Sequence, residues 1–246
     1  SDGPVSQLDG PVFRIPLMRK RPAIDGKFSV EEWEDSSALT GFWSSNCREP
    51  ETLRPRIPYY EHLAPQQIQS WIYGGYDKEN LYLAYVVAVY PKNAWLKALG
   101  RFPEVYGHPL YGLMRDDHIE LEVRPYHDLG RAYQMGMFKW FVNPIGTVAD
   151  QWWSPREGLG RSWQSGAAIQ TDVGPGRWAV EMKIPLKSLK ARDYAGKAKD
   201  GTDIVKLPPP DGTVYRVWFK NGIAGSGQYV VLFDQHVWNT TKTKKK

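Results

Sequence analysis

The sequence predicts an all-β fold, a single β-sandwich with long loop insertions and one or two short helices. Short apolar and aromatic runs recur along the chain, and 23 glycines and 19 prolines separate them, which is typical of strands joined by turns. Several runs alternate with a period of two; within 138–143, residues 138, 140 and 142 share one face and the residues between them share the other. Aromatic residues occur on both faces, so we expect a sheet with one packed side and one side available for binding.

The predicted elements follow the chain in order. A helix-start pattern lies at 29–34, with Ser29 as the N-cap and Glu32 three residues further on, and a second helical turn is expected at 93–99. Long insertions are expected at roughly 44–69, 91–115 and 190–213. The predicted strands are 12–15, 37–43, 70–76, 81–90, 118–124, 134–143, 162–172, 178–184, 214–219 and 229–233.

The size and composition of the chain indicate one folded domain. A chain of 246 residues can bury a sizeable core, and 41% hydrophobic with 24% charged residues is ordinary for a globular protein and unlike a disordered one. Neither a tandem repeat nor a linker between two halves is visible in the sequence. We therefore expect an N-terminal extension at 1–10, a sandwich domain at 11–238 and a basic, disordered tail at 239–246.

The net charge says little about partners. It is +5, but residues 241–246 hold four lysines, and without them 28 Lys and Arg face 27 Asp and Glu, which leaves +1. We therefore expect no specific nucleic-acid partner. Cys47 is the single cysteine, so an internal disulfide is excluded. The longest apolar run, 81–90, is about half the length of a membrane span. The chain opens without a signal peptide or a Met, as a mature or trimmed form would.

Six short motifs occur in order between about residues 23 and 233. They are Ala23-Ile24-Asp25-Gly26 with Glu31-Glu32-Trp33, Tyr76 to Ala84, Asp116 to Leu121, Phe141 to Thr147, Trp178 to Pro185, and Tyr215 to Phe219. As an ordered set they resemble the signatures of family 9 carbohydrate-binding modules, which are related to DOMON-like sandwich domains. The resemblance implies a jelly-roll-like antiparallel β-sandwich. It also implies a non-catalytic, polysaccharide-targeting module of an exported enzyme or surface protein, located outside the cell or in the periplasm.

In that family a sugar is held between two tryptophans, and polar side chains of adjoining strands complete the site. The resemblance implies that the carboxylate that contacts sugar hydroxyls is Glu120. The position of the first sandwiching tryptophan falls on Met114, and the family's strand arginine falls near Phe141. The amide-bearing positions of the penultimate strand fall on Trp218 and Lys220.

The tryptophan sandwich of the family is not preserved, because the loop 224–227, where the second ring would lie, contains no Trp. Strand alternation nevertheless groups other side chains against a core of Ile119, Leu121, Val217 and Phe219. With three cations, one carboxylate and two aromatic rings, this face could accept a polysaccharide or oligosaccharide, including an anionic or sulfated one. The alternative is a solvated sheet face under a long loop. The predicted site residues are Glu120, Lys139, Phe141, Arg216, Trp218 and Lys220.

Two residue pairs are further candidates. Trp152 and Trp153 are adjacent in the chain, so in a strand they point to opposite faces and at most one belongs to the core. The other is a candidate sugar contact. Asp116 and Asp117 could supply oxygen ligands to a structural calcium ion, although two donors are far short of the six to eight that calcium prefers. Capping of a turn is the alternative role for these two carboxylates.

Catalysis is not predicted, because the sequence contains no nucleophile elbow, Gly-rich phosphate loop or Cys–His signature. We expect no cofactor apart from the possible calcium ion. Two other functions stay open. One is a haem-binding cytochrome-type domain, in which Met114 would pair with His118 or Lys220 as an axial ligand. The other is a structural or interaction domain that has kept the sandwich and lost sugar binding.

Overall fold

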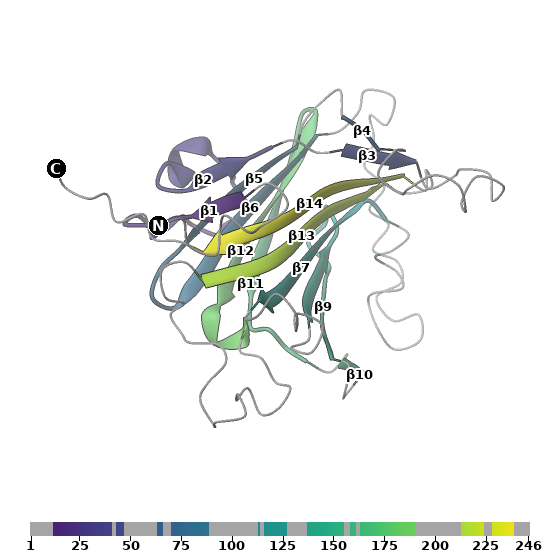
Figure 1. Cartoon of the computed structure of the whole chain (residues 1–246). Helices are drawn as coiled ribbons and strands as arrows, with labels where there is room; N and C mark the ends of the chain where they lie inside the picture. The colour runs from purple at the N-terminus through teal and green to yellow at the C-terminus, as the bar shows by residue number, and fades with distance from the viewer. Residues whose placement is uncertain are drawn as a thin grey trace.

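In the computed structural model the chain forms two antiparallel sheets packed face to face (Figure 1). The larger sheet has nine strands in the order β10-β9-β8-β7-β13-β14-β3-β4, with β1 beside β14; the smaller has five in the order β11-β12-β6-β5-β2. All of these pairings are antiparallel except that of β1 with β14. The structure describes residues 12–40, 43–46, 63–65, 70–88, 113, 116–126, 137–154, 158–160, 163–189, 213–223 and 228–238.

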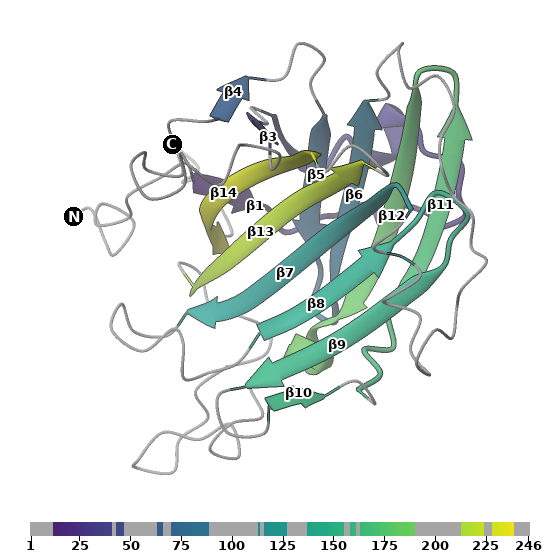
Figure 2. The ribbon, with the colours of Figure 1, turned by 90° about the vertical axis from the view of Figure 1, so that its right-hand side faces the viewer.

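The large sheet contains most of the C-terminal half of the chain, and in Figure 2 its strands β13, β7, β8 and β9 lie side by side in front of the small sheet. Its strands are β1 Val12–Ile15, β3 Trp43–Asn46, β4 Leu63–Pro65, β7 His118–Tyr126, β8 Met137–Val142, β9 Val148–Ser154, β10 Gly158–Gly160, β13 Thr213–Ile223 and β14 Gln228–Trp238. The small sheet consists of β2 Ser37–Leu39, β5 Trp71–Tyr76, β6 Asn80–Ala88, β11 Ala168–Gly174 and β12 Arg177–Pro185. The all-β antiparallel prediction is thus confirmed.

Several predicted boundaries are wrong for a topological reason. The strand predicted at 37–43 is two strands, because β2 pairs with β5 in the small sheet whereas β3 pairs with β14 in the large one. Strands β4, β9 and β10 were not predicted, and the strand predicted at 162–172 begins at 168. The helical turn expected at 93–99 lies outside the described residues.

Two single-turn 3₁₀ helices, η2 Val30–Trp33 and η7 Leu186–Leu189, lie within the described ranges. Ser29 precedes η2, but its side chain makes no capping hydrogen bond, so the capping box predicted with Glu32 is not formed. Within the described residues, no helix is long and apolar enough to cross a membrane.

The core lies between the sheets and is unusually rich in tryptophan. Trp140 and Trp178 are 0% and 1% exposed, and Trp163 packs against the rings of Phe138 and Trp140 with centroids 5.2 and 5.6 Å away. The indole N–H of Trp140 donates to the Ser165 hydroxyl at 3.0 Å, which satisfies its one polar atom. Much of the tryptophan excess is therefore packing rather than binding surface.

A segment at 16–36 crosses the outer face of the small sheet and is held there by Glu181. The Glu181 carboxylate accepts hydrogen bonds from the Gly26 backbone N–H at 3.0 Å and from the Trp33 indole N–H at 3.3 Å. Gly26 has φ +77°, and a Cβ there would lie 2.9 Å from the carbonyl oxygen of Thr171, so the position requires glycine. Burial raises the pKa of Glu181, although both hydrogen bonds act to lower it. Two of the sequence motifs thus meet at one buried carboxylate.

The hairpin between β5 and β6 is closed by Asp77. One carboxylate oxygen accepts the backbone N–H groups of Glu79 and Asn80, both at 2.7 Å. The other oxygen accepts the Tyr82 hydroxyl at 3.0 Å and pairs with the Arg21 guanidinium at 2.7 Å. The motif at residues 76–84 is therefore a structural turn.

Candidate functional site

The outer face of the large sheet carries a different set of side chains from its core face. On β7, Ile119, Leu121 and Val123 belong to the core, so the intervening Glu120 and Glu122 lie on the outer face. On the neighbouring β8, the core residues 138, 140 and 142 leave Lys139 and Phe141 on the outer face. The predicted grouping of Glu120, Lys139 and Phe141 is therefore confirmed.

A three-residue ion-pair cluster lies at the centre of this face. The ammonium of Lys139 contacts Glu122 at 2.8 Å and Glu120 at 3.1 Å. Glu122 is directly opposite Lys139 in the strand register, whereas Glu120 is the diagonal neighbour. The three side chains are 20% (Lys139), 6% (Glu120) and 2% (Glu122) exposed. Burial alone would lower the pKa of Lys139, but the two carboxylates outweigh that effect and raise it.

Strand β9 adds an amide and a small apolar cluster beside these charges. Gln151 is opposite Lys139 in the register and is 7% exposed, and its side-chain oxygen has no hydrogen-bond partner among the described residues. Ala149 is opposite Phe141, and both pack with Leu113 from the region just before β7. The row Glu122–Lys139–Gln151 therefore presents a carboxylate, an ammonium and an amide across three adjacent strands.

Sequence reasoning missed two members of this cluster. Glu122 could have been found, because it follows Glu120 by two residues in a predicted strand and must share its face. Gln151 could not, because β9 was not predicted. The additional carboxylate also changes the expected charge of the face: the described cluster of two glutamates and one lysine carries a net charge of −1.

Strand β13 brings the remaining predicted residues into the same rows. In its register with β7, Lys220 is opposite Glu120, Trp218 is opposite Glu122, and Arg216 is opposite Arg124. Between them, Val217 and Phe219 are buried in the core, as predicted. The backbone thus collects all six predicted positions on one sheet face, while the side chains of Arg216, Trp218 and Lys220 lie outside the described part of the structure.

Of the tryptophan pair, Trp152 is a core residue. It is 3% exposed, and its register partner Phe138 also belongs to the core. Trp152 therefore cannot contribute to the outer face, because its strand position points it between the sheets. Trp153 is opposite Met137 and Leu159 in the register. Because it follows Trp152 in the strand, its position belongs to the outer face, although its side chain is outside the described set. Met114 also lies outside it.

The two predicted metal ligands are buried in a turn network. Asp116 accepts a hydrogen bond from the Asn143 amide at 3.0 Å, and Asn143 in turn accepts the Thr147 backbone N–H at 2.8 Å. Asp116 and Asp117 are 3% and 8% exposed. Among the described residues there is no group of three or more His, Cys, Asp or Glu that could hold a metal ion. These contacts support the turn-capping role of Asp116.

His118 begins β7 beside this turn. Its Nδ1 lies 2.9 Å from the carbonyl oxygen of Asp116, and its ring packs against Phe141 with centroids 6.4 Å apart. Burial lowers the pKa of His118, although the nearby carbonyl and carboxylates act in the opposite direction. A neutral histidine that donates to a backbone carbonyl explains these contacts without an added ligand.

Comparison with known structures gives the same architecture. Two matches are structures of a family 9 carbohydrate-binding module from Caldicellulosiruptor kristjanssonii, one in complex with glucose and one with cellotriose. They share 14% and 15% identity, and both have a TM-score of 0.56. The matches cover 94% and 95% of this chain and 97% of theirs. The chain has a family 9-like fold. A putative carbohydrate-binding protein from Bacteroides uniformis ATCC 8492 shares 11% identity over 94% of this chain and all of its own, with a TM-score of 0.57. No family sequence model matches the chain, and neither does any curated protein sequence.

Proposed function

We propose that the chain is a non-catalytic carbohydrate-binding module that holds a saccharide on the outer face of the large sheet. The observation that carries the proposal is the Glu120–Lys139–Glu122 cluster beside Phe141, on the face where β13 adds Arg216, Trp218 and Lys220. A sugar presents apolar C–H faces and a girdle of hydroxyls. Aromatic rings cover the first, and charged groups fixed by one another bind the second without a large ordering cost.

The charges of the cluster bear on the class of saccharide. The Lys139 ammonium forms ion pairs with both Glu120 and Glu122. The polar atoms of the described cluster are therefore mainly carboxylate oxygens, which accept hydrogen bonds from the hydroxyl groups of a neutral sugar. The anionic ligand considered from the sequence would depend on the cations at positions 216 and 220. We therefore propose a neutral polysaccharide as the first ligand and an anionic one as the alternative that the test must include.

The likeness in fold to modules solved with glucose and cellotriose supports a setting in which the chain targets a larger protein to polysaccharide. In that setting the parent is an exported polysaccharide-degrading enzyme or a surface protein, and the module works outside the cell or in the periplasm. The calcium ion considered from the sequence would be held near Asp116 and Asp117, and chelator treatment that leaves the melting temperature unchanged would argue against it.

Affinity electrophoresis against neutral and anionic polysaccharides tests the proposal. We expect retardation by at least one gel, and weaker retardation of Trp218→Ala and Glu120→Gln. Ile145→Ala is the matched control, because Ile145 is 59% exposed and lies in the turn between β8 and β9, away from the cluster. A folded wild-type chain that no gel retards would overturn the proposal, and would leave a structural or interaction domain as the better description.

A further inference from the structure

The segment at 16–36 buries side chains of the small sheet that would otherwise face solvent. Tyr82 and Ala84 alternate with core residues along β6, so they lie on its outer face. They are nevertheless only 2% and 0% exposed, because they pack with Met18 and Trp33 of the segment. The segment therefore forms a cover over this part of the sheet.

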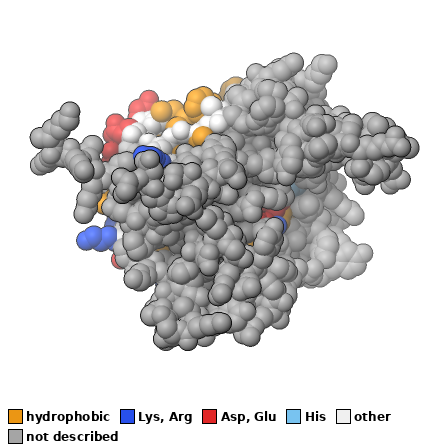
Figure 3. Space-filling model, in the orientation of Figure 1, with side chains coloured by type: hydrophobic (Ala, Val, Ile, Leu, Met, Phe, Trp, Pro, Cys, Tyr) orange, Lys and Arg blue, Asp and Glu red, His pale blue; other side chains and the backbone are white. Residues whose placement is uncertain are grey.

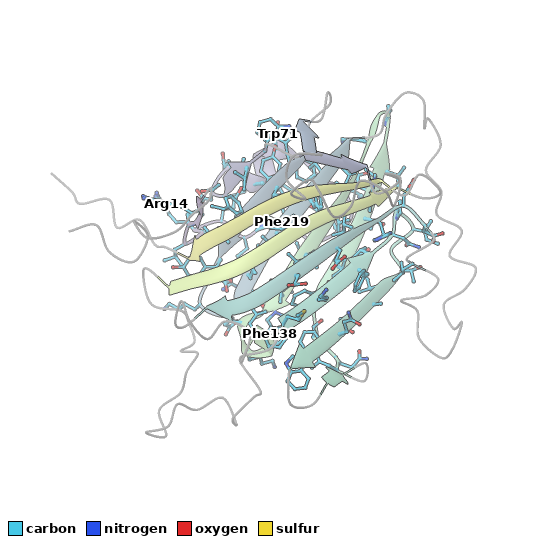
Figure 4. The ribbon with its side chains drawn as sticks, turned by 45° about the vertical axis from the view of Figure 1, so that its right-hand side comes forward. Arg14, Trp71, Phe138 and Phe219 are labelled. Atoms are coloured by element: carbon cyan, nitrogen blue, oxygen red, sulfur yellow. The ribbon has the colours of Figure 1, made fainter. Side chains whose placement is uncertain are left out.

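Trp71 shows the same face of the sheet where it is not covered. It begins β5, where Ile72 faces the core, so alternation places Trp71 on the outer face, and its side chain is 42% exposed. Figure 4 draws Trp71 apart from Phe138 and Phe219, which belong to the core. In Figure 3 the described surface over β2, β5 and η2 shows hydrophobic side chains beside acidic ones. Opening of the cover would add Tyr82 to the aromatic surface that Trp71 already presents.

The two parts of the cover are attached in different ways. At its start, the Tyr76 backbone N–H donates to the Pro16 carbonyl at 3.0 Å, and the Met18 N–H donates to the Tyr76 carbonyl at 2.8 Å. These are backbone bonds that do not depend on charge. In the part at 24–33, by contrast, the hydrogen bonds from a backbone N–H and an indole N–H both end on the carboxylate of Glu181. A titratable side chain therefore takes part in holding the cover.

Acidic groups of the cover act on Glu181. Its side chain is 0% exposed, and burial raises its pKa, while Asp25 and Glu32 of the cover act in the same direction. The two hydrogen bonds lower the pKa but do not reverse the shift. One side-chain oxygen of Glu32 is itself buried without a hydrogen-bond partner among the described residues. The proton on Glu181 is therefore bound more tightly in this arrangement than in water.

The strands beside Glu181 place no charge directly opposite it. Its register partners are Ala84 of β6 and Gln170 of β11, and neither is charged. The other titratable groups around it on this face are Tyr82 of β6, Asp172 of β11, Lys183 of β12 and the exposed Lys27 of the cover. Asp172 is paired with Arg177 at 3.1 Å, and no ion pair of Glu181 is found among the described residues. The negative charge of Glu181 thus meets two hydrogen-bond donors but no paired cation in this part of the structure.

We propose that the segment at 16–36 is a pH-sensitive cover of the small sheet, closed most tightly in mildly acidic solution and opening more readily at neutral pH. Protonation of Glu181 removes a buried negative charge beside Asp25 and Glu32. Because the closed cover raises the pKa of Glu181 above its usual 4.5, the free energy of opening is largest below that value and falls as the pH rises through the raised pKa. The cover lies on the opposite face from the proposed saccharide site, and the proposal does not depend on that site.

Two other carboxylates oppose this trend at lower pH. Asp77 pairs with Arg21 of the cover at 2.7 Å, and Asp35 accepts the backbone N–H groups of Arg19 and Lys20 at 3.0 and 2.8 Å. Burial would raise the pKa of Asp77, but its hydrogen bonds and the Arg21 charge outweigh that effect and lower it, and the hydrogen bonds from Lys20 and Arg19 lower the pKa of Asp35. Their contribution is complete above the usual 3.8 and is lost as the pH falls through the lowered values. Closure should therefore be tightest between 3.8 and 4.5.

Hydrogen exchange followed by NMR measures opening at the two groups that Glu181 holds. The probes are the backbone N–H of Gly26 and the indole N–H of Trp33, and the amides of β7 report unfolding of the whole domain. After correction for the intrinsic exchange rate, protection of both probes should be higher at about pH 4.5 than at about pH 7.5. The expected ratio is about tenfold for each unit by which closure raises the pKa of Glu181.

Three variants separate this mechanism from general destabilisation. Glu181→Gln keeps the size of the side chain and one acceptor oxygen but cannot ionise, so protection should be nearly independent of pH over this range. Glu32→Gln removes a neighbouring negative charge and should raise protection at neutral pH, a gain that misfolding cannot produce. Glu31→Gln is the matched control and should behave as the wild type, since Glu31 is an exposed carboxylate of the same segment.

Equal wild-type protection of the two probes at both pH values would overturn the proposal, as would an unchanged pH dependence in Glu181→Gln. If Glu181→Gln does not fold, Glu32→Gln still decides, because protection at neutral pH no higher than that of the wild type contradicts the mechanism. Probes that exchange in step with the amides of β7 would mean that the whole domain opens, which also contradicts it. Failure of these tests leaves the proposed function untouched, since polysaccharide binding tests that separately.

Discussion

Replacing Lys139 by methionine should lower the free energy of unfolding by about 2–4 kcal/mol at neutral pH. At an effective dielectric constant of about 20, contacts of 2.8 and 3.1 Å correspond to roughly 5–6 kcal/mol of Coulomb attraction each. Much of that is offset by the cost of burying the ammonium, and the 20% exposure of Lys139 reduces it further. The remaining loss arises because Glu120 and Glu122 stay buried side by side without this cation. Methionine fills similar space, so the effect is one of charge.

The pH dependence distinguishes this mechanism from simple loss of packing. The two carboxylates raise the pKa of Lys139 above its usual 10.5, so its stabilising charge is fully present at neutral pH and is lost only as the pH rises through the raised value. In Lys139→Met the deficit should shrink as the pH falls from 7 to about 4, because protonation of the cluster's carboxylates removes the negative charges that Lys139 stabilises in the wild type. A deficit caused by packing would not change over this range.

Urea unfolding followed by tryptophan fluorescence at several pH values measures both effects. Lys183→Met is the matched control, since Lys183 is a half-buried strand lysine of the small sheet for which no ion pair is found among the described residues. The double variant Lys139→Met, Glu122→Gln should recover part of the loss, as one of the two carboxylates is then neutral. A deficit below about 0.5 kcal/mol, or one that is unchanged at low pH, would refute the reasoning.

Three further predictions concern the scaffold. Gly75→Ala should destabilise the fold by about 1–3 kcal/mol in urea unfolding, because its Cβ would overlap the Met18 side chain; Met18→Ala in the same chain should relieve part of this. Burial and the hydrogen bond to Asp77 raise the pKa of Tyr82 to about 12, so ultraviolet titration should show one phenol that ionises near pH 12 and is missing in Tyr82→Phe, and Asp77→Asn should lower its pKa. Trp140→Ala should cost about 3–5 kcal/mol, measured as a shift in the urea midpoint, since the ring is fully buried.

The sequence was sufficient for the fold class and for the two faces of β7 and β13. On β7, Ile119 and Leu121 alternate with glutamates, and on β13, Val217 and Phe219 alternate with Arg216, Trp218 and Lys220. Such alternation leaves one register that buries the apolar side of each strand. The same alternation places Glu120 on the outer face. This alternation is a property of neighbouring residues in the chain, so it can be recognised from the sequence alone.

Strand β9 could not be predicted from its own residues. Val148–Ser154 places Asp150 and Gln151 at its centre, between apolar ends, and neither a period of two nor a turn marks it clearly. Its side chains are explained by partners far along the chain: the Asp150 carboxylate accepts the Ser165 backbone N–H at 2.6 Å, while Trp152 packs in the core. Such a strand is specified by tertiary contacts, which is why Gln151 was missed as part of the candidate site.

The resemblance to family 9 modules also lies in particular residues, and they are scaffold residues. Asp25-Gly26, Trp33 and Glu181 belong to two motifs and meet on the outer face of the small sheet, where Glu181 accepts the hydrogen bonds that hold the segment at 16–36. In contrast, the position of a sandwiching tryptophan is Met114. Fold and ligand are therefore separable in this chain: a substitution at Glu181 should change stability without changing which saccharide binds, whereas a substitution at Trp218 should do the reverse. Motifs that maintain the sandwich cannot identify the ligand, because the faces that would hold it consist of other residues.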